Sequence, residues 1–392
     1  MNLAFLAPLL ERQGPWASAY LETADVSEDA EAVRELQARD AASSLAGLGA
    51  DEATCRAVRD ALASVSRDDA GHAVFAAGGE VVLDVPLATP PPSPPRAFWA
   101  ALPRIAPLLD HAGQDPTCLV AYVDRRGADL EMRGTHGRPT PAGSVAGRQW
   151  PIHRTGRADW SERHFQFAVE NTWEENAARV AGTLAEDAER AHAGMVVLAG
   201  DPRERRAVHE RLPEALREVT VESEHGARAA GSDDRLLDAD VERARAERAR
   251  AEAEEALERF HAARVLGSGG GNGRIDAAEG VPALVDAARE HRIAALLMRP
   301  GGADLHRDVW VGQEPDQVAL RRTDSRALGA PEPAPARADD ALLRSAAATG
   351  ATAVPLPDPT TSPRQIPVGG LGALLRWPYE GTIPGGGVRP GE

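Results

Sequence analysis

The stretch MVVLAGDP, residues 195–202, joins a run without polar side chains to a typical helix start. Met195–Gly200 is short and continuously apolar, as expected of a strand that is buried on both faces. Asp201 can cap a helix, and Pro202 suits the first helical position because its missing N–H is not needed there. We therefore predict a buried strand followed at once by a helix that runs to about Leu216.

The neighbouring segments extend this pattern in both directions. Upstream, Cys118–Asp124 and Ala128–Arg133 are predicted strands joined by a turn at residues 125–127, and Val169–His192 has the spacing of a long amphipathic helix. Downstream, Val219–Glu222 is a short strand. This alternation of strands and helices implies an α/β layer in which helices cover a sheet.

The N-terminal segment predicts a second, smaller α/β unit that ends near Gln114. Its pattern indicates strands and helices up to the Pro-rich stretch Pro86–Pro95, which favours extended backbone and cannot continue the interior of a sheet. The predicted elements are a strand at Trp16–Glu22, helices at Glu28–Leu45 and Asp51–Val65, and a hairpin of His72–Phe75 with Glu80–Val85.

A long charged helix, Leu236–Leu266, leads to the last part of the chain. Such a helix is typical of a solvated face or an interdomain connector. The glycine-rich run Gly267–Gly273 follows a helix rather than a strand, so we interpret it as a hinge and not as a phosphate cradle. The elements expected after it are helices Val281–Arg292 and Asp339–Thr349, strands Ile293–Met298, Asp308–Val311 and Ala353–Leu356, and a flexible insertion at Ala330–Ala338.

These segments predict an α/β protein of three domains with a disordered tail. The N-terminal domain comprises residues 1–114, and the C-terminal domain residues 271–380. The central domain, residues 115–270, contains a long basic loop at 133–167 and the long helix at 236–266. The Gly/Pro-rich tail covers residues 381–392.

The composition excludes several classes of protein. The chain of 392 residues has a formal net charge of −16, and all 44 of its basic side chains are arginine. A Walker P-loop, a lysine Schiff base and the attachment of pyridoxal phosphate all need a lysine, so these chemistries are excluded, and we predict no cofactor. The negative field opposes general binding to nucleic acid, so we expect no DNA partner and, at most, a local contact with RNA.

The cysteines and the N-terminus favour a cytoplasmic protein. Cys55 and Cys118 lack the spacing of a zinc site and are interpreted as two buried, reduced thiols. Residues 17–19 imitate a signal-peptidase site, but no basic residue precedes the short apolar stretch, which contains Pro8. No run approaches the roughly 18 apolar residues that cross a membrane.

One segment is basic, whereas the chain as a whole is acidic. Residues 133–167 read RGTHGRPTPAGSVAGRQWPIHRTGRADWSERHFQF, with six arginines, two acidic residues and a formal charge of +4. Aromatic side chains are interleaved with the arginines. Guanidinium groups bind phosphate oxygens and aromatic rings stack on unpaired bases, so the segment favours RNA contact. The alternative is an ordinary surface loop that its tryptophans pin to the domain.

The candidate RNA contacts are the arginines and aromatic rings after residue 147, with one histidine that can be protonated near phosphate. They are Arg148, Trp150, His153, Arg154, Arg157, Trp160 and Arg163. His136, His153 and His164 have neither HxxxH nor HExxH spacing, so no metal site is predicted. The sequence also lacks a GxSxG nucleophile elbow.

Several motifs, in this order, resemble the archaeo-eukaryotic release factor and Pelota superfamily. The chain is similar to its bacterial family and, within that, to the actinobacterial Balon-like branch of ribosome hibernation factors. The motifs are Gly14–Tyr20, Val123-Asp124 with Gly127–Asp129, Trp150–Arg154 with Phe165-Gln166, Val196–Gly200, Val281–Leu284 with Leu296-Leu297, and Gly370–Trp377.

The resemblance implies a three-domain protein of tRNA-like shape that enters the ribosomal A site. It implies that the N-terminal domain approaches the decoding centre and that the central loop reaches the rRNA of the peptidyl-transferase centre. The C-terminal domain would engage a translational GTPase, elongation factor Tu in the Balon-like branch. Release factors carry Gly-Gly-Gln in that loop, whereas here Gln149 follows Gly147-Arg148 and Gln166 follows His164-Phe165.

The sequence therefore favours a non-catalytic factor that occupies the vacant A site during starvation or stress. One alternative is a peptidyl-tRNA hydrolase or rescue factor in which Gln149 would be the catalytic residue. A second alternative is an α/β protein that binds a small molecule.

Overall fold

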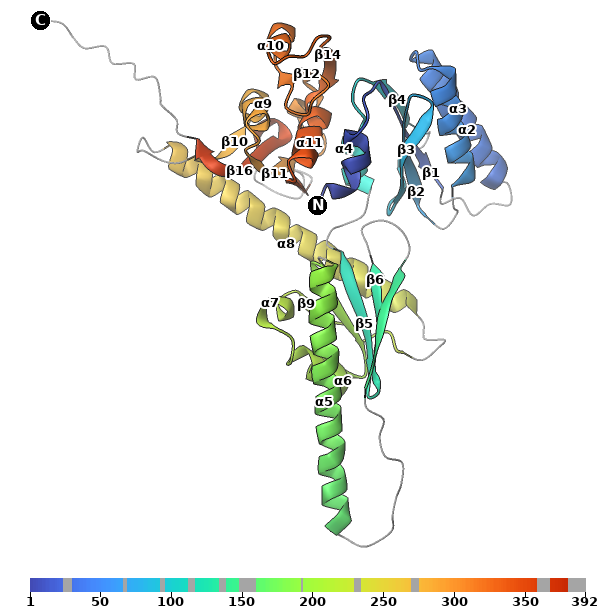
Figure 1. The fold of residues 1–392 in the computed structure, drawn as a ribbon, viewed down its shortest axis with the longest axis vertical. Helices are drawn as coiled ribbons and strands as arrows, with labels where there is room; N and C mark the ends of the chain where they lie inside the picture. Colours follow the sequence, from blue (N-terminus) through green and yellow to red (C-terminus); the bar gives the residue numbers. More distant parts are fainter. Residues whose placement is uncertain are drawn as a thin grey trace, which may run out of the picture. The chain divides into compact units, whose positions relative to one another are not determined.

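The chain forms two compact units, each of mixed α/β structure as predicted. The computed structural model describes residues 1–23, 30–65, 69–91, 96–111, 117–133, 139–147, 160–191, 193–228, 234–268, 275–357 and 367–379 (Figure 1). One unit contains Gln114–Ala249, and the other combines Met1–Gly113 with Arg250–Glu392. The division into three domains stays a prediction; by contacts, the first and last segments fall within one unit.

The central unit is built on a five-stranded sheet. Its middle strand pairs in parallel with the strand of the MVVLAGDP stretch, Cys118 opposite Met195. It pairs on its other side with the returning strand of the hairpin, which is antiparallel. In sheet order the strands are β7 (Thr140–Ala146), β6 (Gly127–Arg133), β5 (Cys118–Asp124), β8 (Met195–Gly200) and β9 (Thr220–Glu222).

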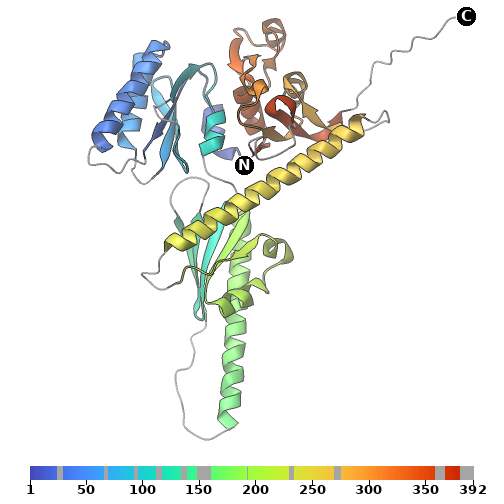
Figure 2. The same cartoon turned by 180° about the vertical axis from the view of Figure 1, so that it is seen from behind.

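Helices cover both faces of this sheet, which explains why β5 and β8 are continuously apolar. The helices are α5 (Trp160–Arg190), α6 (Pro202–His209), α7 (Glu214–Arg217) and α8 (Asp234–Ser268). On one face Leu119 and Leu198 share a core with Leu184 of α5. On the other face lies the first half of α8, whose Leu237 and Val241 belong to the second core. Helix α5 is nearer the viewer in Figure 1 and α8 in Figure 2.

The start of β6 depends on a glycine. Gly127 has φ of 140°, and a Cβ added there would lie 1.8 Å from the carbonyl oxygen of Val145 in the adjacent strand. Gly143, in β7, has almost the same φ of 138°, but a Cβ there would meet no atom within 4 Å. Alanine substitutions at Gly127 and Gly143 therefore distinguish the cost of backbone strain, which both share, from the cost of steric overlap, which arises only at Gly127.

We expect Gly127→Ala to lower the free energy of unfolding by about 1–3 kcal/mol more than Gly143→Ala does. Both variants force alanine into a disfavoured φ, which costs roughly 1–3 kcal/mol, and only the first also overpacks the hairpin. Urea unfolding followed by far-ultraviolet circular dichroism measures both losses. Equal losses would show that β7 can move away from β6.

Two expectations for the central unit are wrong. The segment 133–167 is not one loop: β7 lies within it, and α5 begins at Trp160 instead of Val169. The last glycine of the segment is Gly156, and no helix breaker follows it, so the helix can begin earlier. The helix from Pro202 does not reach Leu216, because α6 ends at His209 and Pro213 interrupts the helical hydrogen bonds before α7.

The second unit begins with an antiparallel sheet. Successive side chains of its first strand point alternately to the two faces of this sheet. Ala17, Ala19 and Leu21 pack under two helices. Trp16 and Tyr20, on the other face, belong to a core shared with the C-terminal segment. In sheet order the strands are β3 (Glu80–Leu87), β2 (Gly71–Ala77), β1 (Trp16–Glu22) and β4 (Arg96–Ala100), and the helices are α1 (Ala7–Leu10), α2 (Ala30–Gly47), α3 (Glu52–Ser64) and α4 (Ala106–His111), with the 3-10 turn η1 (Ala4–Leu6).

The C-terminal segment adds two further sheets. The larger, in sheet order, consists of β10 (Ile275–Glu279), β16 (Leu371–Tyr379), β11 (Ile293–Met298) and β15 (Thr352–Pro355). The smaller consists of β13 (Val318–Ala319), β12 (Asp308–Val311) and β14 (Ala334–Arg337). The remaining elements are α9 (Val281–Arg289), α10 (Arg322–Ala327), α11 (Ala338–Ala348), η2 (Ala303–His306) and η3 (Val368–Gly370).

The expected flexible insertion at Ala330–Ala338 is therefore wrong, because β14 lies within it and pairs with β12. Proline is compatible with this strand since β14 is at the edge of its sheet, where one row of N–H groups is not used. The helix predicted to Arg292 ends at Arg289. The glycine-rich hinge beyond Ser268 and the tail lie outside the described residues.

The long charged helix α8 is more than a solvated connector. Its second half packs on the larger C-terminal sheet, where Leu257 and the fully buried Phe260 join Leu297 and Leu374. One helix thus presents an apolar surface to each of the two units. No helix in the described part of the chain is long and apolar enough to cross a membrane.

Candidate nucleic-acid interface

Most of the predicted RNA contacts lie outside the described residues. These are Arg148, Trp150, His153, Arg154 and Arg157, together with Gln149. Trp160 and Arg163 lie in the first turn of α5, where the backbone alone is described. None of the seven side chains is thus among those that the structure describes, and their contact with RNA stays a prediction; the structure describes the strand that enters the segment and the helix that leaves it.

The point where the chain leaves β7 is held by several hydrogen bonds. The Gly147 N–H donates to the carbonyl oxygen of Arg126 at 2.6 Å. From α5, Arg179 donates to the carbonyl oxygen of Ala146 at 3.2 Å, and Asn176 donates to that of Arg125 at 3.2 Å. A Cβ at Gly147 would lie 2.6 Å from the Asn176 side chain, so a larger residue would require that side chain to shift. The entry point of residues 148–159 is fixed to α5 and to the β5–β6 turn.

A group of cations and an aromatic ring lies at the same end of the sheet. The guanidinium groups of Arg125 and Arg203 each lie 4.9 Å from the centre of the Trp173 ring. Arg125 comes from the β5–β6 turn, Trp173 from α5 and Arg203 from the first turn of α6. The Arg125 side chain is 62% exposed, and its charge is available to solvent. Arginine and tryptophan in contact suit a phosphate-bearing chain with unpaired bases.

The buried Glu204 lies beside this group. Its carboxylate lies 3.9 Å from Arg125. Burial, and then the charge of Asp201, raise the pKa of Glu204, while Arg125 and Arg203 act in the opposite direction. We name the group of Arg125, Trp173 and Arg203 the arginine–tryptophan cluster.

Arg133 does not contribute to the basic surface of the segment. It is buried, and it donates to Glu131 at 2.7 Å and to Asp238 of α8 at 2.6 Å. Burial alone would lower the pKa of the guanidinium, but these hydrogen bonds raise it. Arg133 therefore joins β6 to α8 and has no free face for RNA.

The arginine–tryptophan cluster is a feature that sequence reasoning missed. Its members are separated by 48 and 30 positions, so no local pattern connects them. The available signals were an arginine pair directly after a buried strand and a proline-started helix after the neighbouring parallel strand. Because β5 and β8 are parallel, the segments that follow them meet at one edge of the sheet.

Comparison with known proteins places the similarity on this unit. Residues 117–265 match the family model described as bacterial archaeo-eukaryotic release factor family 2. This range covers the sheet, the basic segment and most of α8.

Two relatives extend the similarity along the chain. They are uncharacterized proteins from two strains of Mycobacterium tuberculosis, each 28% identical over 378 residues, which is 94% of this chain and 95% of the relative.

Solved structures with similarity to this chain include an archaeal translation termination factor and Pelota proteins. An archaeal translation termination factor is 14% identical, with 96% of this chain and 98% of that chain covered and a TM-score of 0.25. Archaeal Pelota from a ribosome-bound model is 13% identical, with 96% and 94% covered and a TM-score of 0.40. Pelota from Archaeoglobus fulgidus is 15% identical, with 78% and 79% covered and a TM-score of 0.30.

Proposed function

We propose that this chain, which belongs to the bacterial archaeo-eukaryotic release-factor-like family, is a ribosome-binding translation factor without hydrolytic activity. It occupies the vacant A site, with residues 148–159 directed to the rRNA of the peptidyl-transferase centre. As a hibernation factor of the Balon-like branch, it acts during starvation or stress, and its C-terminal segment engages elongation factor Tu.

The observation that carries the proposal is the match of the central unit to a release-factor family model, because the matched range contains the basic segment. The chain outside residues 133–167 is strongly acidic, so this segment is the favourable place for a phosphate backbone. The arginine–tryptophan cluster at its entry enlarges the cationic and aromatic surface. Both features support binding to RNA that presents phosphates and unpaired bases.

The sequence of the segment supports binding over catalysis. Gln149 follows Gly147-Arg148, so it lacks the paired glycines of the Gly-Gly-Gln motif and their conformational freedom. Gln166 is inside α5 and has a helical backbone. Neither glutamine fits the pattern that positions water on a peptidyl-tRNA ester.

The test combines ribosome binding with peptide release. We expect the purified chain to pellet with 70S ribosomes through a sucrose cushion, and an A-site tRNA to compete with it. We expect no release of labelled peptide from stalled ribosomes above the buffer control. Release that Gln149→Ala abolishes would instead identify a rescue factor. Failure to pellet at both low and moderate salt would favour the small-molecule-binding alternative.

A further inference from the structure

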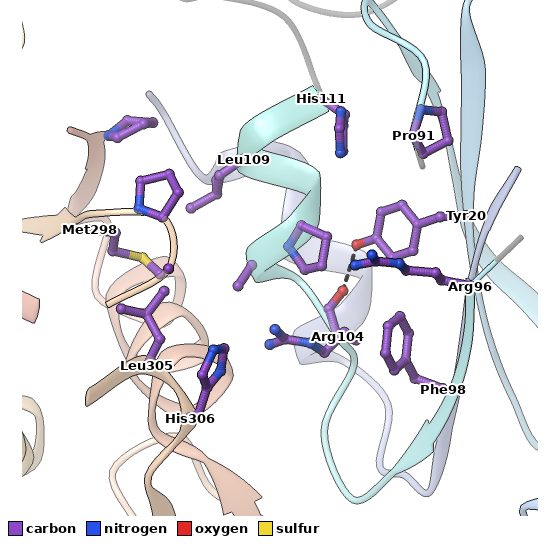
Figure 3. A pocket seen from close by; sticks show the side chains of 15 residues that line it. Tyr20, Pro91, Arg96, Phe98, Arg104, Leu109, His111, Met298, Leu305 and His306 are labelled. Atoms are coloured by element: carbon purple, nitrogen blue, oxygen red, sulfur yellow. Dashed lines mark hydrogen bonds between the residues drawn. The ribbon is translucent and has the colours of Figure 1, made fainter. Parts of the chain in front are cut away.

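A pocket of about 280 Å³ lies in the unit that combines the N- and C-terminal segments (Figure 3). Its walls come from β1 and β4 on one side, from α4, and from the end of β11 with η2 on the other. This volume is just below the usual range for small-molecule sites, about 300–1,000 Å³.

The charge of the lining is opposite to that of the chain. The whole sequence has 60 acidic residues, yet among the described residues no carboxylate lines the pocket, whereas two arginines and two histidines do. Arg104 is neutralised because it donates to Asp339 at 3.0 Å and to Asp340 at 2.8 Å. Arg96 forms no ion pair with another residue in the described ranges, and its guanidinium extends from β4 toward α4 in Figure 3. The uncompensated charge in the pocket is therefore that of Arg96.

The other walls supply apolar and planar contacts. Leu109, Met298 and Leu305 lie across the pocket from Arg96 in Figure 3. The Phe98 ring stands beside Arg96 on the same strand wall. His111 lies at the α4 end, where burial and then the charge of Arg96 lower its pKa. A ligand that fits has an anionic group for Arg96 and a flat, largely apolar group for the opposite wall.

We propose that this pocket binds a nucleotide, with its phosphate at Arg96 and its base between Phe98, on the strand wall, and Leu305, on the opposite wall. Arginine binds phosphate oxygens by charge-assisted hydrogen bonds, and an aromatic ring offers a face or edge to a base. The nucleotide is either a free mononucleotide or an unpaired nucleotide of an RNA strand. The inference goes beyond the proposed function and does not depend on ribosome binding.

The experiment is isothermal titration of the full chain with AMP, inorganic phosphate, adenosine and a single-stranded pentaadenylate. We expect AMP or pentaadenylate to bind with Kd below about 1 mM, which corresponds to roughly −4 kcal/mol. Arg96→Gln is expected to weaken that binding at least about tenfold, the effect of one charge-assisted contact. Arg56→Gln is the control, because Arg56 is also exposed and lies on α3, outside the pocket.

The outcomes distinguish a free mononucleotide from an unpaired nucleotide of an RNA strand, and some of them would overturn the inference. Binding of AMP identifies a free nucleotide as sufficient, and binding of pentaadenylate alone identifies an RNA strand. Equal affinity of phosphate and AMP would overturn the role of the base, and equal loss in the Arg56→Gln control would overturn the role of Arg96. The absence of binding by both nucleotide probes at about 10 mM, weaker than the 1 mM expectation, would overturn the proposal.

Discussion

The double variant Arg148→Glu/Arg154→Glu is expected to weaken binding to 70S ribosomes at least about 100-fold. Hydrogen bonds between charged groups contribute about 1.5–3 kcal/mol each, and two lost contacts correspond to this factor or more. Glutamate also places negative charge where the wild type has positive charge, which adds repulsion from the phosphate backbone. The measurement is the fraction that pellets with ribosomes over a range of ribosome concentrations.

The salt dependence of the same binding gives an independent readout. Each contact with a single-stranded phosphate contributes about −0.7 to the slope of log K against log salt concentration, so the slope of the variant should be shallower than that of the wild type by roughly 1.4. The control is Arg321→Glu/Arg326→Glu, which makes the same charge change on exposed residues at α10. If this control loses binding as strongly as the loop variant does, net charge and not the segment governs ribosome binding.

Local patterns predicted several strands well because those strands are flanked by clear breaks, whereas β4, β7, β10, β13, β14 and β16 were not predicted. Trp16–Glu22 and Met195–Gly200 match β1 and β8 at both ends, and Cys118–Asp124 matches β5. These stretches are buried on both faces or alternate cleanly between two cores, so burial selects the same residues that the apolar pattern identifies. The two cysteines, expected to be buried and reduced, are free and buried.

Those local patterns could not predict the pairing between segments that are distant in the sequence. Strand β14 contains two alanines, one proline and one arginine, and it is a strand because β12 offers a partner at the sheet edge. The charged helix α8 looks solvated along its length, since charged residues surround its apolar positions. Leu237 and Phe260 are buried because each half of the helix packs against a different sheet.

The candidate site was only partly predictable for the same reason. The excess of arginine in residues 133–167 is a property of composition and could be found directly. The burial of Arg133 against Asp238 depends on a contact across 105 positions, and the arginine–tryptophan cluster depends on the parallel pairing of β5 with β8. Charge counts locate a basic segment, but only packing shows which of its arginines remain accessible.

The unit that contains both chain ends depends on a network of four charges whose two aspartates are buried. Arg104, from the N-terminal segment, donates one nitrogen to both Asp339 and Asp340 at the start of α11. Asp339 also accepts from Arg337, at 2.6 Å, and Asp340 accepts the N–H groups of Ile105 and Ala106, at 2.9 and 3.2 Å. The network is neutral and its aspartates are fully hydrogen bonded, which is the condition under which buried charges are tolerated.

Removal of one partner should therefore be strongly destabilising. We expect Arg104→Gln to lower the free energy of unfolding by about 3–5 kcal/mol at neutral pH, because it leaves two buried carboxylates with one arginine. In the double variant Arg104→Gln/Asp340→Asn the charges again balance, so the loss should be smaller than that of Arg104→Gln alone. Chemical unfolding of both proteins measures the difference. A double variant as unstable as the single variant would mean that Arg104 acts through packing and not through charge.

The pH dependence of the single variant tests the same network by another route. Burial, and secondly the charge of Asp339, raise the pKa of Asp340 to about 6, while Arg104 lowers it. Because this pKa lies above the ordinary value of 3.8, ionisation of Asp340 destabilises the folded state, and stability falls as pH rises from about 4 through 6. Arg104→Gln removes the opposing charge, so the fall should be steeper and extend to higher pH. The variant should thus be closest to the wild type near pH 4.5, where Asp340 is protonated in the fold. A deficit that is the same at pH 4.5 and pH 8 would contradict an ionised Asp340 as its cause.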